Sequence, residues 1–287
     1  MKNILLSIPF LFCSCNNTGK YLKVVGELDK NEISGIQYIT KTNDVWALED
    51  SGNKNEIYRL GKNGGIEHTV EIEGAENEDW EDMTADSSGN IYIGDFGNND
   101  NDRKNLVIYK VNQADLRNDE VKPEYEITFK YEDQKEFPPK KSERYFDVEA
   151  FFEKDGFFYL FTKNRSAGFN GDFSVYKLPN KAGNYTAKRI ATLNSCGAYR
   201  KCAIAAADIS PDGKTIALLG GDKIWLIEHY NGTFIQDRMQ QYELGHYSEK
   251  EGITFKDNNT LLIADEKDKG TGGLLYEIKI SQLKAER

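Results

Sequence analysis

The sequence has few histidines, few cysteines, no long apolar run and no cluster of basic residues. With three histidines and four cysteines in 287 residues, a zinc site is not expected. No apolar run approaches the roughly 18 residues of a membrane-spanning helix, so we do not expect the chain to cross a membrane. The 47 acidic residues exceed the 37 lysines and arginines, giving a net charge of −10. Because no block of five or more basic residues occurs, nucleic acid is not an expected partner.

The N-terminus nevertheless points to a membrane surface. Met1-Lys2 carries a positive charge, Ile4 to Phe12 form a short apolar stretch, and Ser14 directly precedes Cys15. This arrangement is typical of a secretory signal peptide, and its end resembles the lipobox of bacterial lipoproteins, in which the cysteine is acylated. The alternative is a buried N-terminal strand. We expect residues 1–14 to be removed and a lipid on Cys15 to anchor the protein to the cell envelope.

The expected location is the outer membrane, facing either the periplasm or the outside. Residues 15–20 would then form a tether, and residues 21–287 a single domain. Besides Cys15, the predicted mature chain keeps Cys196 and Cys202, which are close in sequence and would lie in an oxidising compartment. We therefore predict a local disulfide between them.

A repeat of short strands predicts an all-β fold. Apolar or alternating segments recur between clusters of turn residues, and they align as repeated units. The opening segments are 32–36, 79–83, 147–151, 205–209 and 249–253; the second strands are 45–48, 91–94, 158–161, 216–219 and 261–264; and the third strands are 56–60, 106–111, 173–178, 223–227 and 274–278. A fourth strand is visible at 125–129.

Four-stranded units repeated around an axis are the blades of a β-propeller. The sequence favours five blades. A sixth is the alternative, placed in 113–146, although that segment is better interpreted as a long loop between blades. Residues 22–25 precede the first unit, and we expect them to supply the outer strand of the last one and so close the ring.

The first strand of each propeller blade lines the central channel, so equivalent positions face one another across the axis. The third position of the opening segments holds Ser34, Glu81, Glu149, Ala207 and Glu251. Clustered carboxylates repel one another unless they are protonated or neutralised by a cation, and hard oxygen ligands suit Ca²⁺, with Mg²⁺ second. We predict a divalent-cation site at Ser34, Glu81, Glu149 and Glu251. The alternative is a polar channel filled with water.

An outer ring of polar residues is expected around the same mouth. Its members, from the segment starts and the ends of the second strands, are Glu32, Asp79, Asp147, Glu249, Asp50, Asp95, Asn164 and Asp265. The basic residues expected to meet an anionic ligand are Arg103, Arg144, Lys163 and Arg165. Asp and Asn in tight loops also occur for backbone reasons alone, which is the other interpretation.

The segments Asp79-Trp80-Glu81-Asp82-Met83, Ile91 to Asn99 and Asp147-Val148-Glu149-Ala150 resemble secreted bacterial propellers of the SdiA-regulated and "esterase-like activity of phytase" families. A more distant likeness is to the calcium-activated nucleotidases (apyrases). These are five-bladed propellers with Ca²⁺ in the channel, whose ligands Ser, Glu, Glu, Ser and Glu fall on Ser34, Glu81, Glu149, Ala207 and Glu251. The resemblance implies a channel Ca²⁺, whereas alanine at 207 departs from the nucleotidase pattern.

Two functions follow as hypotheses. The first is a binding module, expected to be monomeric, whose channel mouth takes a small anionic ligand, a glycan or a protein. The second is a Ca²⁺-dependent phosphoesterase, in which the cation would polarise a phosphoryl oxygen and Asp50 or Asp95 would serve as the base. The sequence favours the binding module, because the machinery of a nucleophilic hydrolase is missing.

Overall fold

The computed structural model describes residues 21–285. The predicted signal peptide, Cys15 and the tether therefore lie outside the described residues. Within this range the fold is all-β, as the sequence predicts, and the helices are short: α1 (Tyr199–Cys202), α2 (Ile280–Lys284) and the 3-10 turns η1 (Lys141–Glu143) and η2 (Gln236–Arg238). None of these helices is long and apolar enough to cross a membrane.

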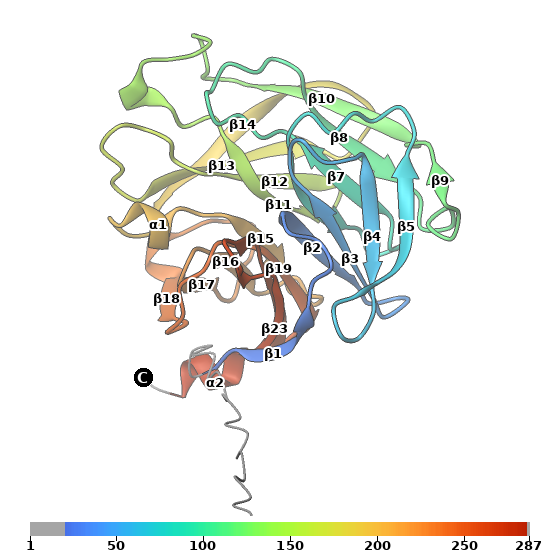
Figure 1. Ribbon diagram of the computed structural model, residues 1–287. Helices are drawn as coiled ribbons and strands as arrows, with labels where there is room; N and C mark the ends of the chain where they lie inside the picture. The colour runs from blue at the N-terminus through green and yellow to red at the C-terminus, as the bar shows by residue number, and fades with distance from the viewer. Residues whose placement is uncertain (1–20, 286–287) are drawn as a thin grey trace, which may run out of the picture.

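The strands form sheets in which consecutive strands pair antiparallel (Figure 1). One sheet contains β2 (Ile33–Ile39), β3 (Asp44–Glu49), β4 (Glu56–Leu60) and β5 (Ile66–Ile72), with β9 (Glu120–Val121) parallel at its edge. Two four-stranded sheets contain β15 (Ala206–Ile209), β16 (Ile216–Leu219), β17 (Lys223–Ile227) and β18 (Met239–Glu243), and β19 (Lys250–Asp257), β20 (Thr260–Asp265), β23 (Leu274–Lys279) and β1 (Lys23–Glu27).

The largest sheet has eight strands and consists of two antiparallel runs. These runs are β6 (Trp80–Ala85), β7 (Ile91–Asp95), β8 (Leu106–Val111) and β10 (Tyr125–Tyr131), and β11 (Val148–Lys154), β12 (Phe157–Thr162), β13 (Asp172–Pro179) and β14 (Gly183–Asn194). The outer strands β10 and β14 pair in parallel and join the two runs. A small hairpin of β21 (Lys267–Asp268) and β22 (Thr271–Gly272) follows β20.

The first strands of these runs form a closed ring at the centre of the molecule. β2 packs against β6, β6 against β11, β11 against β15, β15 against β19, and β19 against β2. The N-terminal strand β1 pairs with the C-terminal β23, as expected for residues 22–25, so the two ends of the described chain lie in one sheet (Figure 1). Residues 113–146 supply β9, β10 and η1 to neighbouring sheets.

The hydrophobic core lies between neighbouring runs of strands. One cluster joins Trp46 of β3 to Ile93 of β7, and the next joins Ile108 of β8 to Phe158 of β12. Further clusters join β12 to β16, β17 to β20, and β20 to β3. Each run therefore buries apolar side chains on both of its faces, which explains why second strands such as β7 and β16 are buried throughout, whereas the outer strands β14 and β18 are largely polar.

Buried polar side chains connect the inner strands, which do not pair as a sheet. The Asp82 carboxylate accepts a 3.0 Å hydrogen bond from the backbone N–H of Phe151 on the next inner strand. Asp208 likewise accepts 2.7 Å and 3.0 Å hydrogen bonds from the Phe255 N–H and the Thr254 hydroxyl. Buried backbone donors must find acceptors, and these carboxylates supply them across the gap between strands.

Candidate functional site

The pairing of the first two strands is interrupted at the same place in four of the runs. The register shifts between Ile33 and Gly35, between Trp80 and Asp82, between Val148 and Ala150, and between Lys250 and Gly252. The inserted residues are Ser34, Glu81, Glu149 and Glu251, the four predicted cation ligands. β-bulges redirect a side chain and are common beside active sites. In the fifth run the pairing begins at Ala206 and Leu219, so the equivalent position is Ala205, two residues before the predicted Ala207.

Three acidic side chains meet at the centre of this region. Glu81, Asp147 and Glu149 are all buried, and each offers a carboxylate oxygen within 4.8 Å of the others. Asp147 immediately precedes β11, and Glu149 is the bulge residue of that strand. We call these residues the acidic triad. The sequence analysis places Glu81 and Glu149 in the cation site and Asp147 in the outer ring.

Two basic residues that follow β12 balance part of this charge. The Lys163 ammonium donates a 2.7 Å hydrogen bond to Glu149 and lies 3.5 Å from a Glu251 oxygen. The Arg165 guanidinium donates to both Asp147 and Glu149. The sequence analysis assigns both residues to an anionic ligand. In the structure they are counterions of the chain's own carboxylates.

The Glu81 carboxylate lacks such a partner. Its side chain is 6% exposed, and within residues 21–285 it has no hydrogen bond or ion pair. Burial raises its pKa well above the usual range, and Glu149 and Asp147 raise it further. If residue 97 carried a side chain, its Cβ atom would lie 2.2 Å from a Glu81 oxygen. The glycine at this position therefore leaves space for the carboxylate.

The other two members of the triad respond differently to the same surroundings. Burial and the neighbouring Glu149 raise the pKa of Asp147 to about 8, despite Arg165. Burial also acts to raise the pKa of Glu149, but Lys163 and Arg165 hold it below its usual value. The triad therefore contains one well-compensated carboxylate and two that carry excess negative charge when ionised.

The predicted outer ring is only partly free to meet a ligand. Burial and Glu32 raise the pKa of Asp50 to about 7, and burial also raises the pKa of Asp79. Asp95 instead accepts a 2.8 Å hydrogen bond from Arg103. Ser34, which is a predicted cation ligand and not a member of the ring, donates a 3.1 Å hydrogen bond to the Trp80 carbonyl.

Several further members of that ring form hydrogen bonds within the chain. Asp265 is fully buried and accepts from the Leu274 N–H and the Tyr276 hydroxyl, each at 2.8 Å. Asn164 donates 2.9 Å to the Asp172 carbonyl. Arg144 lies 3.1 Å from Asp100, which is largely exposed. The backbone interpretation of loop Asp and Asn residues therefore holds for Asn164, whereas Asp265 is the last residue of β20 and bonds to the neighbouring strand β23.

A cavity of about 390 Å³ opens beside the acidic triad. Its lining includes the predicted residues Lys163, Arg165, Glu249 and Glu251, and also Tyr199, Arg200, Tyr247 and Glu266, which the sequence analysis does not select. Glu266 directly follows the predicted Asp265, and of these two residues Glu266 is the one that lines the cavity.

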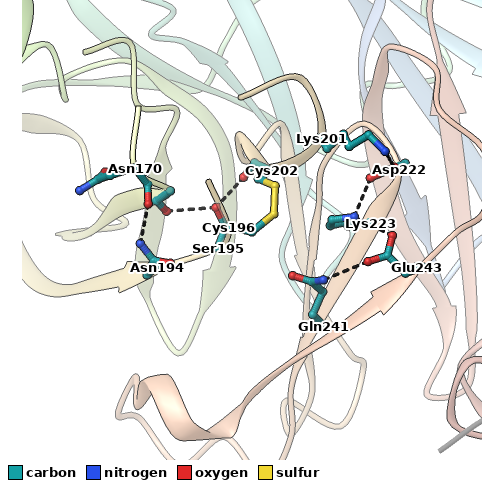
Figure 2. The surroundings of a disulfide bond; sticks show 11 residues. Asn170, Asn194, Ser195, Cys196, Lys201, Cys202, Asp222, Lys223, Gln241 and Glu243 are labelled. Carbon is teal, nitrogen blue, oxygen red and sulfur yellow. Dashed lines mark hydrogen bonds and ion pairs between the residues drawn. A yellow bond between two sulfur atoms is a disulfide. The ribbon is translucent and has the colours of Figure 1, made fainter. Parts of the chain in front are cut away.

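The predicted disulfide is present and borders this cavity. Cys196 and Cys202 are bonded to each other and enclose α1, which carries Tyr199 and Arg200 (Figure 2). The Ser195 hydroxyl donates 2.6 Å to the Cys202 carbonyl, and Lys201 forms a 2.8 Å ion pair with Asp222. The loop is therefore fixed at both ends.

No protein-family model matches this chain, and no curated protein matches it in sequence. Among solved structures, the chain is similar to a chain of the Kuenenia stuttgartiensis hydrazine synthase, at 10% identity and a TM-score of 0.41. The match covers 85% of this chain and 59% of that chain. At this distance the similarity does not bear on function.

Proposed function

We propose that the protein is a cell-envelope lipoprotein with a five-bladed β-propeller, whose channel mouth holds a divalent cation and acts as a binding module. Ca²⁺ is the first choice of cation and Mg²⁺ the second. The observation that carries the proposal is the buried Glu81 carboxylate, which lacks a partner and lies within the acidic triad.

The sheet arrangement supports the propeller. The eight-stranded sheet divides into two antiparallel runs, and with the three sheets of four or five strands it gives five inner strands in a closed order. The hydrophobic clusters follow the same cyclic order. The lipid anchor is supported by the sequence of residues 1–15 alone.

The charge balance supports the cation. At the centre of the site the four carboxylates of Glu81, Asp147, Glu149 and Glu251 are accompanied by the two cations Lys163 and Arg165, which leaves an excess of two negative charges when all six groups are ionised. A divalent ion would neutralise this excess. The donors are hard oxygens, as Ca²⁺ and Mg²⁺ prefer, and the larger Ca²⁺ tolerates irregular geometry better. Glu81, Asp147 and Glu149 would hold the ion.

Isothermal titration of the EDTA-treated protein with Ca²⁺ and with Mg²⁺ tests the proposal. Replacing Glu81 by Gln keeps the shape of the side chain and removes its charge, so we expect Ca²⁺ to bind at least about tenfold more weakly. Glu136→Gln makes the same change at an exposed position of the loop after β10 and should leave binding unchanged. Equal Ca²⁺ affinity in the two variants would disprove the site.

A Ca²⁺-dependent phosphoesterase is the second candidate, favoured by one observation. The pKa of Asp50 is raised to about 7, which suits a general base near neutral pH. Asp95, the other candidate base, is paired with Arg103. Phosphate release from nucleotides and from phytate, compared between the wild type and Asp50→Asn, tests this candidate. Turnover that Asp50→Asn abolishes would favour the enzyme over the binding module.

A further inference from the structure

The cavity beside the acidic triad exists because one run of strands lacks large side chains at its inner end. Ala203 and Ala205, which precede β15, line the cavity. Ala206 pairs with Leu219 as Asp82, Ala150 and Gly252 pair with the second strands of their runs, so Ala205, and not the predicted Ala207, occupies the position that holds Glu81, Glu149 and Glu251 in the other runs. The absence of these carboxylates leaves space on one side of the channel mouth. The volume of about 390 Å³ lies in the range of small-molecule sites.

Charges of opposite sign line this cavity from different runs of strands. Arg200 on α1 contributes a guanidinium that has no ion pair or hydrogen bond with any residue between 21 and 285. On the side of β19 and β20, Glu249, Glu251 and Glu266 contribute carboxylates. Burial and the nearby Glu251 raise the pKa of Glu266 to about 9, as expected where carboxylates lack cations.

The backbone of α1, which carries Arg200, is held in place without a ligand. The disulfide and the Lys201–Asp222 ion pair fix α1 (Figure 2). The Tyr199 hydroxyl accepts 2.8 Å from Arg165, and a Cβ at Gly221 would lie 2.3 Å from the Arg200 carbonyl oxygen. A site ordered in advance loses less conformational entropy when a ligand binds.

We infer that the cavity binds a small zwitterion, a free α-amino acid or a dipeptide, with its carboxylate on Arg200 and its ammonium among Glu249, Glu251 and Glu266. An arginine guanidinium can bind a carboxylate through two parallel hydrogen bonds. Tyr199 and Tyr247, which are 38% and 48% exposed, line the same cavity and offer rings to the remainder of the ligand.

Ligands of one charge fit the cavity less well. A phosphate or a dicarboxylate would face the carboxylates of Glu249 and Glu266, and a simple amine would leave Arg200 without a partner. The inference extends the proposed binding role of the channel mouth, but it does not need the acidic triad or its cation.

Calorimetry on the EDTA-treated protein tests the inference, with the twenty common amino acids and the dipeptide Ala-Ala as probes. We expect at least one probe to bind with a dissociation constant below about 1 mM. Its N-acetyl derivative lacks the ammonium and its C-terminal amide lacks the carboxylate, and each should bind at least about tenfold more weakly. Arg200→Gln and Glu266→Gln should weaken binding similarly, whereas Arg117→Gln, at an exposed position before β9, should not.

Three results would overturn the inference: no probe binds below about 1 mM, the blocked derivatives bind as well as the parent, or inorganic phosphate or putrescine binds where the amino acids do not. Adding Ca²⁺ separates the two proposals. Zwitterion binding in EDTA by a protein that ignores Ca²⁺ would support the cavity and refute the cation. Ca²⁺ binding without zwitterion binding would do the reverse.

Discussion

Lys163 donates a 2.7 Å hydrogen bond to Glu149, so the acidic centre of the molecule contains a cation that belongs to the chain. The side chain of Lys163 is 13% exposed and that of Glu149 is 2% exposed. The same ammonium is close to Glu251. A single lysine therefore connects the inner ends of β11 and β19, two strands that are not neighbours in the ring.

Replacing Lys163 should lower the stability of the protein in EDTA and raise its affinity for Ca²⁺. Lys163→Met leaves Glu149 and Glu251 without their shared counterion, and the loss of one member of a buried ion pair costs about 3 kcal/mol. We expect denaturant unfolding in EDTA to report this loss, and saturating Ca²⁺ to recover a larger part of it than in the wild type. Lys188→Met, at an exposed ion pair with Glu132, serves as the control. Ca²⁺ affinity that falls in Lys163→Met would contradict this account.

Glu266 should make the stability of the protein depend on pH. Its pKa is about 9 in the folded protein, against a usual value of 4.5, so between these values the folded state binds more protons than the unfolded state. Its contribution to stability is complete below about pH 4.5 and is lost as the pH rises towards 9. Glu266→Gln lacks this titration, so its free energy of unfolding should increase relative to that of the wild type as the pH rises. A difference that stays constant from pH 5 to pH 9 would exclude a raised pKa.

Asp208 is expected to be a stabilising link between inner strands. Asp208→Ala leaves the Phe255 N–H and the Ile209 N–H without their acceptor, and unsatisfied buried donors cost about 1 to 3 kcal/mol each. We expect a loss of about 3 kcal/mol in urea unfolding. Asp237→Ala, at an exposed position of η2, should change stability little. A comparable effect in both variants would mean that the inner strands do not depend on this link.

The disulfide should matter more for the cavity than for the acidic triad. Its loop is short, with a sequence separation of 6, so the chain-entropy model assigns it about 2 kcal/mol. In the Cys196→Ala, Cys202→Ala double variant we expect this loss in thermal or chemical unfolding. We also expect weaker binding of any cavity ligand, with the Ca²⁺ affinity retained. Loss of Ca²⁺ binding together with the disulfide would show that the two sites are not separable.

The lipid anchor has its own test, independent of the fold. Cys15→Ser removes the thiol that would be acylated, so the protein should move from the membrane fraction to the soluble fraction when bacterial cells are fractionated. Cys13→Ser, two residues earlier in the chain, should keep the membrane location. If both variants fractionate like the wild type, Cys15 is not the site of attachment.

The repeat in the sequence predicted the elements of this fold and the positions of its central acids, because alignment of the units relates residues that are far apart in the chain. Ser34, Glu81, Glu149 and Glu251 were selected in this way, and all four are bulge residues. The bulges themselves could not be predicted, because an inserted residue is defined only by the register with the partner strand.

The pairing of charges could not be predicted either. Lys163 and Arg165 have long, flexible side chains, and their positions after β12 do not reveal whether they face a ligand or the carboxylates of the neighbouring strand β11. Asp265 and Asn164 had the right residue types near the expected positions, yet Asp265 bonds to the neighbouring strand β23 and Asn164 bonds to the Asp172 carbonyl at the end of its own loop. Sequence position shows which loops approach the channel mouth, whereas side-chain direction depends on backbone geometry within each loop.

The alanines before β15 give the channel mouth a direction. Carboxylates at this position in every run would place similar groups evenly around an axis, and an evenly surrounded site can select a ligand by charge and size but not by orientation. The run of β15 instead carries Ala205 where three other runs carry Glu81, Glu149 and Glu251, and Ala205 lines the cavity. This departure from rotational symmetry opens one side of the rim, so the two ends of an asymmetric molecule meet different surroundings there.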